Sequence, residues 1–298
     1  MRADQALVAR GLASSRSAAQ RLIADGAVRL AQGPILRKPS HLVSELDDLQ
    51  VDASDETRFV SRAGAKLDHA LTHFGIDPAG LEILDLGQST GGFTDCLLQR
   101  GASRVVGIEV GHGQLHERLR RDPRVVCIER TNLRDLDRPA LQARIEQVCG
   151  MNLQADAAKG NGSKDIGPEG NGRKGTSQKV NRPKDPGCMP GFNMAVADLS
   201  FISLAKVLPA INRLLEPQAC VLMLVKPQFE LGPSALDSKG IVKSESLART
   251  AVDLIAQSAS ELGWQVLGCT ESVVRGTDGN LEFFLNARTR ESGNAQGS

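Results

Sequence analysis

Residues 85–95 read Asp85-Leu86-Gly87-Gln88-Ser89-Thr90-Gly91-Gly92-Phe93-Thr94-Asp95. A short, mainly apolar run at 81–86 precedes the glycines, and the spacing of apolar residues at 93–100 is typical of an amphipathic helix. A strand that ends in a glycine-rich turn and opens a helix is where open α/β folds bind nucleotide-like ligands, because the helix N-terminus offers unpaired N–H groups. The stretch therefore predicts a ligand-binding turn, with an ordinary strand-to-helix connection as the alternative.

The residue types of this turn favour one kind of ligand. Its spacing is not G-x-G-x-x-G, and no basic residue accompanies it that could hold a pyrophosphate. An uncharged turn suits a zwitterionic ligand that carries a nucleoside, and S-adenosylmethionine (SAM) is the obvious candidate. The residues of the turn expected to contact SAM are Asp85, Gly87, Ser89, Thr90, Gly91, Gly92 and Phe93.

Composition limits the class of protein. A length of 298 residues suggests about two domains, and a formal net charge of +1 means that any nucleic-acid surface must come from local clustering of charge. The six cysteines are scattered and include no C-x-x-C pair. This pattern indicates reduced thiols in a cytoplasmic protein. The longest apolar stretch of the C-terminal half, 219–225, is too short to span a bilayer. Aromatic residues are sparse, which argues against RNA recognition on a stacking platform.

Residues 1–57 are predicted to form a small α+β domain. Asp4 is expected to cap a first helix that ends near Gly11, and a second helix is expected at 16–24. Short strands are expected at 27–30 and 48–51. Basic residues lie along the helices and the following turn, namely Arg10, Arg16, Arg21, Arg29, Arg37 and Lys38.

The order of features in this domain resembles an S4 RNA-binding domain. The motif G-L-A-S-S-R-S-x-A-x-x-L-I-x-x-G-x-V at 11–28 carries the resemblance, which covers nearly all of 1–52. The resemblance implies that a basic helix face binds folded RNA through its phosphates. The candidate RNA contacts are Arg10, Arg16, Arg21 and, on the next helix, Arg62. The alternative is a solvated helix pair with ordinary surface arginines.

Residues 58–298 are predicted to form an α/β domain with a Rossmann-like fold. Strands are expected at 81–86, 104–109, 125–128, 193–197, 219–225, 265–269 and 281–286, and helices at 62–74, 92–100, 114–120, 137–148, 204–215 and 244–262. This alternation predicts a mostly parallel sheet with helices on both faces, completed by an antiparallel hairpin. The segment 151–191, which is rich in Gly, Asn and Lys, is expected to be a flexible insertion.

Polar residues at the ends of these strands are further candidates for cofactor binding. Glu109 ends the second strand, where a carboxylate commonly accepts hydrogen bonds from ribose hydroxyls. Glu129 and Asn132 follow the third strand, where an adenine ring would be bound. For each of these residues the alternative is a polar side chain that only meets solvent.

Four charged residues are candidates for catalysis. Asp198 and Lys226 follow the fourth and fifth strands, and the carboxyl ends of parallel strands open onto one crevice. Partial burial of an ammonium disfavours its charged form, so that Lys226 could accept a proton from a weak acid such as a sugar hydroxyl. Glu282 lies among apolar residues of the final strand and needs a cationic partner, either Lys66 or Lys226. The alternative for each residue is a surface ion pair.

The motifs together resemble the TlyA family of ribosomal RNA 2′-O-methyltransferases, which join an S4 domain to an FtsJ/RrmJ-like catalytic domain. They are S-R-x-G-x-K-L at 61–67, the turn at 85–95, D-x-S-F-I-S-L at 198–204, L-V-K-P-Q-F-E at 224–230 and G-N-x-E-F at 279–283. The resemblance implies methyl transfer from SAM to the 2′-oxygen of a cytidine in 23S ribosomal RNA, with 16S RNA as an open second substrate. The family's catalytic tetrad maps onto Lys66, Asp198, Lys226 and Glu282, with Lys226 as general base and Asp198 also beside the methionine part of SAM.

The chain departs from the family pattern at four positions. Gln88 stands where the family usually has a small residue, Glu109 replaces an aspartate and His112 replaces a tyrosine. Phe59 stands in place of a tryptophan in the interdomain linker. These departures leave the tetrad intact, so that an active enzyme with altered cofactor affinity is expected.

Two other functions remain open on the sequence. One is a non-enzymatic ribosome-assembly factor, and the other is a membrane-active protein, since the family also carries a haemolysin name. The pairs His69/His73 and His112/His116 have the i,i+4 spacing of metal ligands but no third ligand in a recognisable motif, so no metal is expected.

Overall fold

The computed structural model describes residues 1–13, 16–24, 28–31, 33–44, 47–51, 58–159, 191–276 and 278–291. The chain forms two compact units, Met1–Ala65 and Lys66–Ser298, and each is described by itself. Most of the predicted insertion, residues 160–190, lies outside the described residues.

The first unit consists of two helices and a two-stranded sheet. Helix α1 spans Ala3–Ala9 and α2 spans Arg16–Ala24, while β1 (Val28–Leu30) pairs antiparallel with β2 (Leu49–Val51). Their apolar residues form one small core, made of Ala3, Ala6, Leu7, Ala19, Leu22, Ile23, Val28, Leu36, Val43 and Leu49.

The prediction that Asp4 caps α1 is wrong. The helix begins at Ala3, two residues before the expected start, so that Arg2 is the N-cap residue and Asp4 lies inside the first turn, fully buried. Its carboxylate accepts hydrogen bonds from the side chains of Arg2, Arg16 and Gln20 at 3.0–3.1 Å. The Arg2 hydrogen bond, together with those from Gln20 and Arg16, holds the pKa of Asp4 well below its usual range in spite of burial. Asp4 therefore ties the start of α1 to α2.

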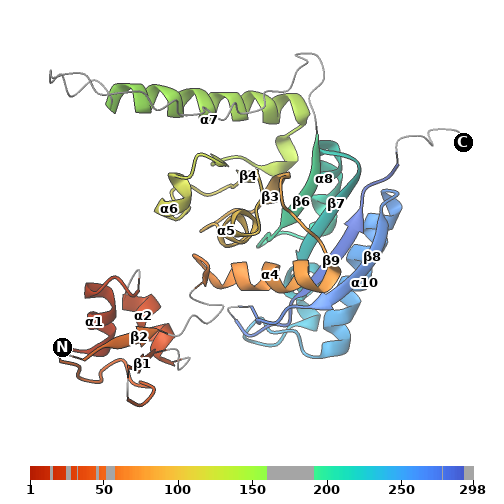
Figure 1. The fold of residues 1–298 in the computed structure, drawn as a ribbon. Helices are drawn as coiled ribbons and strands as arrows, with labels where there is room; N and C mark the ends of the chain where they lie inside the picture. The colour runs from red at the N-terminus through yellow and green to blue at the C-terminus, as the bar shows by residue number, and fades with distance from the viewer. Residues whose placement is uncertain are drawn as a thin grey trace, which may run out of the picture. The chain divides into compact units, whose positions relative to one another are not determined.

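The second unit is built on a seven-stranded sheet of order β5-β4-β3-β6-β7-β9-β8 (Figure 1). The strands are β3 (Glu82–Leu86), β4 (Arg104–Ile108), β5 (Val125–Ile128), β6 (Phe192–Ala197), β7 (Leu215–Val225), β8 (Gln265–Glu271) and β9 (Phe283–Arg288). Strands β3 to β7 pair in parallel, whereas β9 runs antiparallel to both β7 and β8. The predicted fold class, a mainly parallel sheet completed by an antiparallel hairpin, is confirmed.

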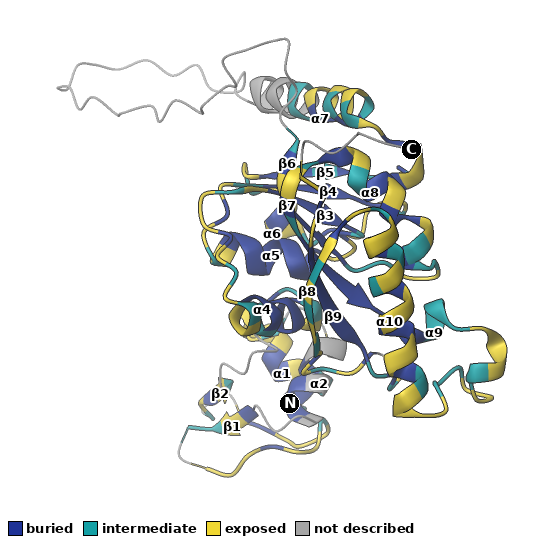
Figure 2. Ribbon diagram, turned by 90° about the vertical axis from the view of Figure 1, so that its right-hand side faces the viewer, coloured by how far each residue is buried: buried dark blue, intermediate teal, exposed yellow. Residues whose placement is uncertain are grey.

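Helices cover both faces of this sheet. Figure 2 shows α4 (Arg62–Phe74) and α5 (Gly92–Gln99) on one face and α8 (Leu208–Leu214) and α10 (Glu245–Glu261) on the other. The remaining helices are α6 (Glu117–Arg120), α7 (Arg138–Lys159), α9 (Pro227–Glu230) and the 3-10 turns η1 (Leu133–Asp135), η2 (Leu204–Lys206) and η3 (Pro233–Ala235). Helix α7 continues to Lys159, so the first nine residues of the expected insertion are helical.

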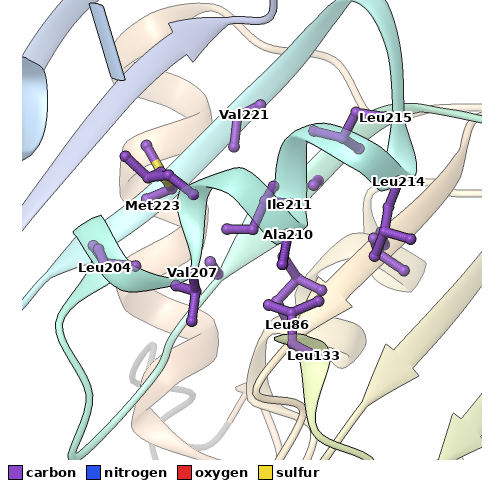
Figure 3. Close-up of a cluster of buried hydrophobic side chains, with 14 of the residues drawn as sticks. Leu86, Leu133, Leu204, Val207, Ala210, Ile211, Leu214, Leu215, Val221 and Met223 are labelled. Atoms are coloured by element: carbon purple, nitrogen blue, oxygen red, sulfur yellow. The ribbon is translucent and has the colours of Figure 1, made fainter. Parts of the chain in front are cut away.

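One core cluster of this unit lies between the strands of the sheet and the chain that follows β6. Figure 3 shows Leu204, Val207 and Ile211 from the chain after β6, together with Leu86 of β3 and Met223 of β7. All five side chains are at most 2% exposed. Such dense packing fixes the strand ends and the loops that leave them.

Chain order reverses at β3, because β4 and β5 lie on one side of it and β6 lies on the other. Ligands of open α/β sheets bind outside the carboxyl ends of the strands at such a reversal. In this sheet, the loops that follow β3 and β6 are therefore the expected place for a ligand.

Candidate active site

The turn after β3 has glycine where a side chain would not fit. Gly87 has a φ of +83°, and a Cβ there would lie 2.4 Å from the carbonyl oxygen of Asp198. Gly91 has a φ of +91° at the start of α5, and its Cβ would meet Leu119 at 2.4 Å. Gly87 therefore allows the loops after β3 and β6 to approach each other, and Gly91 allows α6 to pack against the turn.

A cavity of about 380 Å³ opens at the carboxyl ends of β3, β4 and β6. Five of the predicted cofactor-binding residues line it: Gly87, Ser89, Glu109, Asn132 and Asp198. Much of the remaining lining is apolar, from Leu86, Ile108, Val110, Leu133, Leu199, Phe201, Ile202 and Val207. A mainly apolar pocket of this size with a few carboxylate and amide groups suits a nucleoside.

The other predicted cofactor residues do not line the cavity. Asp85 is fully buried in β3, and Phe93 is buried with its ring 6.0 Å from that of Phe284. Thr90, Gly91 and Gly92 form the start of α5, where the carbonyl of Thr90 accepts the N–H of His116. Any contact of these residues with SAM remains a prediction.

Glu109 joins the first two loops of the site. Its carboxylate accepts the N–H of Ser89 at 2.9 Å and the N–H of Gly111 at 2.7 Å. Each carboxylate oxygen keeps a second lone pair, and Glu109 lies on the cavity wall, so it can also accept hydrogen bonds from ligand hydroxyls.

Glu129 and Asn132 follow β5 but have different surroundings. Glu129 accepts hydrogen bonds from Arg120 and from the N–H of Gly113, each at 2.8 Å. Burial acts to raise the pKa of Glu129, but the Arg120 and Gly113 hydrogen bonds outweigh it and lower the pKa. The Asn132 side chain caps η1 by accepting the N–H of Arg134 at 3.1 Å. Of these two predicted adenine contacts, Asn132 alone is at the cavity.

A buried polar chain supports the turn from below. Thr94 donates to Asp85 at 2.6 Å and accepts from the Gln88 amide at 2.9 Å. Burial raises the pKa of Asp85 to about 7, with the Thr94 hydrogen bond opposing the rise and the Asp198 charge adding to it. Gln88 occupies the space over Gly107, where a Cβ would lie 2.0 Å from its amide carbon. A larger side chain is accommodated at position 88 because β4 has glycine opposite it.

The four tetrad residues form two ion pairs. Lys66 Nζ lies 2.5 Å from Glu282 Oε2, and both side chains are nearly inaccessible to solvent. Lys226 Nζ lies 2.6 Å from Asp198 Oδ1 and also donates to Ser200 Oγ at 2.9 Å. Of the two cations proposed for Glu282, the structure selects Lys66.

Strand pairing brings the two ion pairs to one edge of the sheet. Val225 of β7 pairs with Phe283 of β9, so Lys226 and Glu282, one residue outside each strand, occupy facing register positions. Glu282 thus precedes β9, whereas the sequence placed it inside the final strand. The N–H of Asp198 bonds the carbonyl of Leu86, which fixes the loop after β6 against β3 at the same edge.

Sequence reasoning missed three residues beside this edge. Ser200 contacts Lys226, and Phe201, on the cavity wall, is 91% exposed with a φ of +62°. The ring of Phe229 lies 5.3 Å from that of Phe201. All three residues lie inside the two long motifs at 198–204 and 224–230, and this position is the sequence signal that could have identified them.

The arginines predicted to bind RNA differ in their surroundings. Arg10 donates to the carbonyl of Ser44 at 2.8 Å, and Arg16 binds Asp4 at 3.0 Å with its side chain 55% exposed. Arg62 is exposed at the start of α4. The side chain of Arg21 lies outside what the structure describes. Within the described residues, no group of three or more His, Cys, Asp or Glu side chains is arranged to hold a metal ion.

The fold and site define a SAM-dependent methyltransferase. The family model of FtsJ-like methyltransferases matches residues 59–289, and that of the S4 domain matches residues 1–49. The chain therefore belongs to the TlyA family, in which an S4 domain precedes an FtsJ-like methyltransferase domain. The protein is a methyltransferase and its cofactor is SAM.

Three similar proteins illustrate the family. The 16S/23S rRNA (cytidine-2′-O)-methyltransferase TlyA of Mycobacterium tuberculosis is 40% identical, over 97% of this chain and 90% of its own. Hemolysin A of Brachyspira hyodysenteriae is 30% identical, over 96% of this chain and 99% of its own. A solved structure described as a candidate hemolysin from Streptococcus thermophilus superimposes with a TM-score of 0.64 at 29% identity, over 98% of this chain and 89% of that chain.

Proposed function

We propose that the protein methylates the ribose 2′-hydroxyl of a cytidine in ribosomal RNA. The 23S RNA is the expected substrate and 16S RNA a second one to be tested. We assign RNA binding to residues 1–57 and methyl transfer to residues 58–298. The relative from Mycobacterium tuberculosis is named for this reaction. The two ion pairs of the tetrad, one of which includes Asp198 of the cavity wall, support the transfer of this function to the present chain. A ribosomal RNA substrate also points to the cytoplasm as the place of action.

The residues around the cavity fit SAM. Glu109 is placed to accept hydrogen bonds from ribose hydroxyls, and the apolar side chains of Ile108 and Leu133 offer walls for an adenine ring. The carboxylate of Asp198 offers a counter-charge for a sulfonium. When bound, SAM supplies an electrophilic methyl group on a positively charged sulfur.

Lys226 is proposed to deprotonate the 2′-hydroxyl. Its Nζ lies 2.6 Å from Asp198 Oδ1, in an ion pair, and donates a hydrogen bond to Ser200 Oγ, so the amine is held beside Asp198 on the cavity wall. An amine held at this position can take the proton of a 2′-hydroxyl bound beside it.

Lys66 and Glu282 are proposed to orient the reacting groups. Their ion pair is buried, and Glu282 faces Lys226 across the strand register. A rigid, preorganised neighbour of this kind limits the positions that Lys226 and a bound hydroxyl can adopt.

The deciding experiment is a map of 2′-O-methylcytidine in ribosomal RNA by mass spectrometry. Purified wild-type protein with SAM should introduce the modification, and Lys226→Ala should abolish it while leaving SAM affinity within about threefold. Lys239→Ala, which removes an exposed lysine of a nearby loop, is the matched control and should behave as wild type. Wild-type modification by Lys226→Ala would refute the assigned role.

The two other functions predict different results. Among the described residues, no helix is long and apolar enough to cross a membrane. A membrane-active protein would release dye from liposomes, whereas a methyltransferase would not. A non-enzymatic assembly factor would fail to bind SAM in a calorimetric titration, whereas the cavity described above should bind it.

A further inference from the structure

Two segments that follow neighbouring parallel strands are interlocked. We call residues 198–204 the Asp198 segment and residues 226–230 the Lys226 segment. The ion pair, the Ser200 hydrogen bond and the aromatic contact described above join them near their beginnings. At their far ends, Glu230 Oε1 accepts the backbone N–H of Leu204 at 2.9 Å, and the Ser203 side chain also hydrogen-bonds to Glu230.

The carboxylate of Glu230 has an unusual environment for a charged group. It is half-buried, and within the described part of the chain it forms no ion pair with a Lys, Arg or His side chain. Burial raises its pKa, against the lowering effect of the Leu204 N–H and the Ser203 hydrogen bond. A carboxylate so placed is stabilised mainly by these two donors, which makes the backbone at Leu204 its specific partner.

The Asp198 segment needs such a restraint, because its backbone is strained. Phe201 has a φ of +62°, a region that residues with a Cβ rarely adopt, and its ring is almost fully exposed. Strained residues persist when their surroundings fix them. Here the N–H of Asp198 bonds the Leu86 carbonyl at the entry of the segment, and Glu230 binds Leu204 at its exit.

We infer that Glu230 is a positioning residue for methyl transfer, which holds the Asp198 segment in register with the Lys226 segment. Glu230 acts through Ser200, which contacts the proposed base, and through Phe201, which lines the cavity. The inference rests on the proposed function for the role of Lys226. Glu230 lies outside the tetrad, and its side chain determines where Ser200 and Phe201 lie.

Three substitutions separate the hydrogen bond from the charge. Glu230→Gln keeps an acceptor oxygen at the same reach without the charge. Glu230→Asp keeps the charge on a shorter side chain that does not reach Leu204, and Glu230→Ala removes both. Glu261→Ala, an exposed glutamate on α10, is the control. Each full-length variant is assayed for kcat and KM on ribosomal RNA, SAM affinity, thermal unfolding and hydrogen exchange of peptides covering 198–206.

Glu230→Ala and Glu230→Asp should lower kcat by about tenfold or more with SAM affinity nearly unchanged, because a misplaced site slows the chemical step. Both should exchange faster at 198–206, whereas Glu230→Gln should match wild type in both measurements. Wild-type rates and exchange in Glu230→Asp, or equal losses in Glu230→Gln and Glu230→Ala, would overturn the inference. If wild-type protein transfers no methyl group to RNA, the proposed function fails, while the exchange data still decide the role of Glu230.

Discussion

Lys66 Nζ and Glu282 Oε2 lie 2.5 Å apart although 216 positions separate them in the sequence. Helix α4 supplies the lysine and the residue before β9 supplies the glutamate. Two charges withdrawn from water are tolerated here because each neutralises the other. The pair therefore contributes to the fold as well as to the proposed chemistry, and experiments must separate these two contributions.

Replacing both charged residues together separates the contribution of the ion pair to stability from its contribution to catalysis. Glu282→Ala or Lys66→Ala should lower the free energy of unfolding by about 3 kcal/mol, since either change leaves a buried charge without its partner. The double variant Lys66→Met with Glu282→Leu should recover most of that stability and remain inactive. Urea unfolding and the methylation assay measure the two quantities. A stable, fully active double variant would show that the pair is structural alone.

Gly87 can be tested against a matched glycine. Gly87→Ala combines a positive φ with a contact of 2.4 Å to the Asp198 carbonyl, so SAM affinity should fall by about tenfold or more. Gly113→Ala has a similar φ of +69°, but nothing lies within 4 Å of the added Cβ. Calorimetric titration should therefore find near-normal affinity in Gly113→Ala. If both variants lost SAM affinity equally, the cause would be backbone strain at the substituted glycine and not the close contact between the loops after β3 and β6.

The buried carboxyl of Asp85 predicts a dependence of stability on pH. Its pKa is raised from 3.8 to about 7, so the folded protein retains a proton that the unfolded chain has lost. The stabilisation from this group is fully present below about pH 4 and is lost as pH rises through 7, by up to about 4 kcal/mol. Asp85→Asn cannot ionise. The difference in unfolding free energy between wild type and Asp85→Asn should therefore change steadily from pH 4.5 to 7.5, and a constant difference would contradict the raised pKa.

The sequence predicted the sheet and the carboxyl ends of its parallel strands well, because both depend on local patterns. Alternating apolar runs and glycine turns are short-range signals, and the carboxyl ends of parallel strands must share one edge. This rule alone brought Asp198 and Lys226 together, and the demand of a buried charge for a partner limited Glu282 to two candidates.

Other parts of the site depend on contacts that no local pattern encodes. Asp4 looked like a helix cap, but the side chains of Arg2, Arg16 and Gln20 converge on it from two helices. Phe201 looks like one more apolar residue in the sequence, whereas in the structure it has a positive φ and is 91% exposed. The low aromatic content of the chain therefore says little about whether one exposed ring is available at the cavity.

Gln88 shows how a departure from the family pattern is compensated. Its amide fills the space above Gly107 and binds Thr94, so that residues 88 and 107 form a matched pair at the ends of β3 and β4.

Gly107→Ala places a Cβ 2.0 Å from the Gln88 amide carbon and should destabilise the protein by about 1–3 kcal/mol through overpacking. Gln88→Ala should lose the buried hydrogen bond to Thr94 at a cost of about 1 kcal/mol. The double variant should be more stable than the sum of these losses, because alanine at 88 leaves room for alanine at 107. Urea unfolding of the four proteins tests this coupling, and strictly additive losses would contradict the packing that the structure shows.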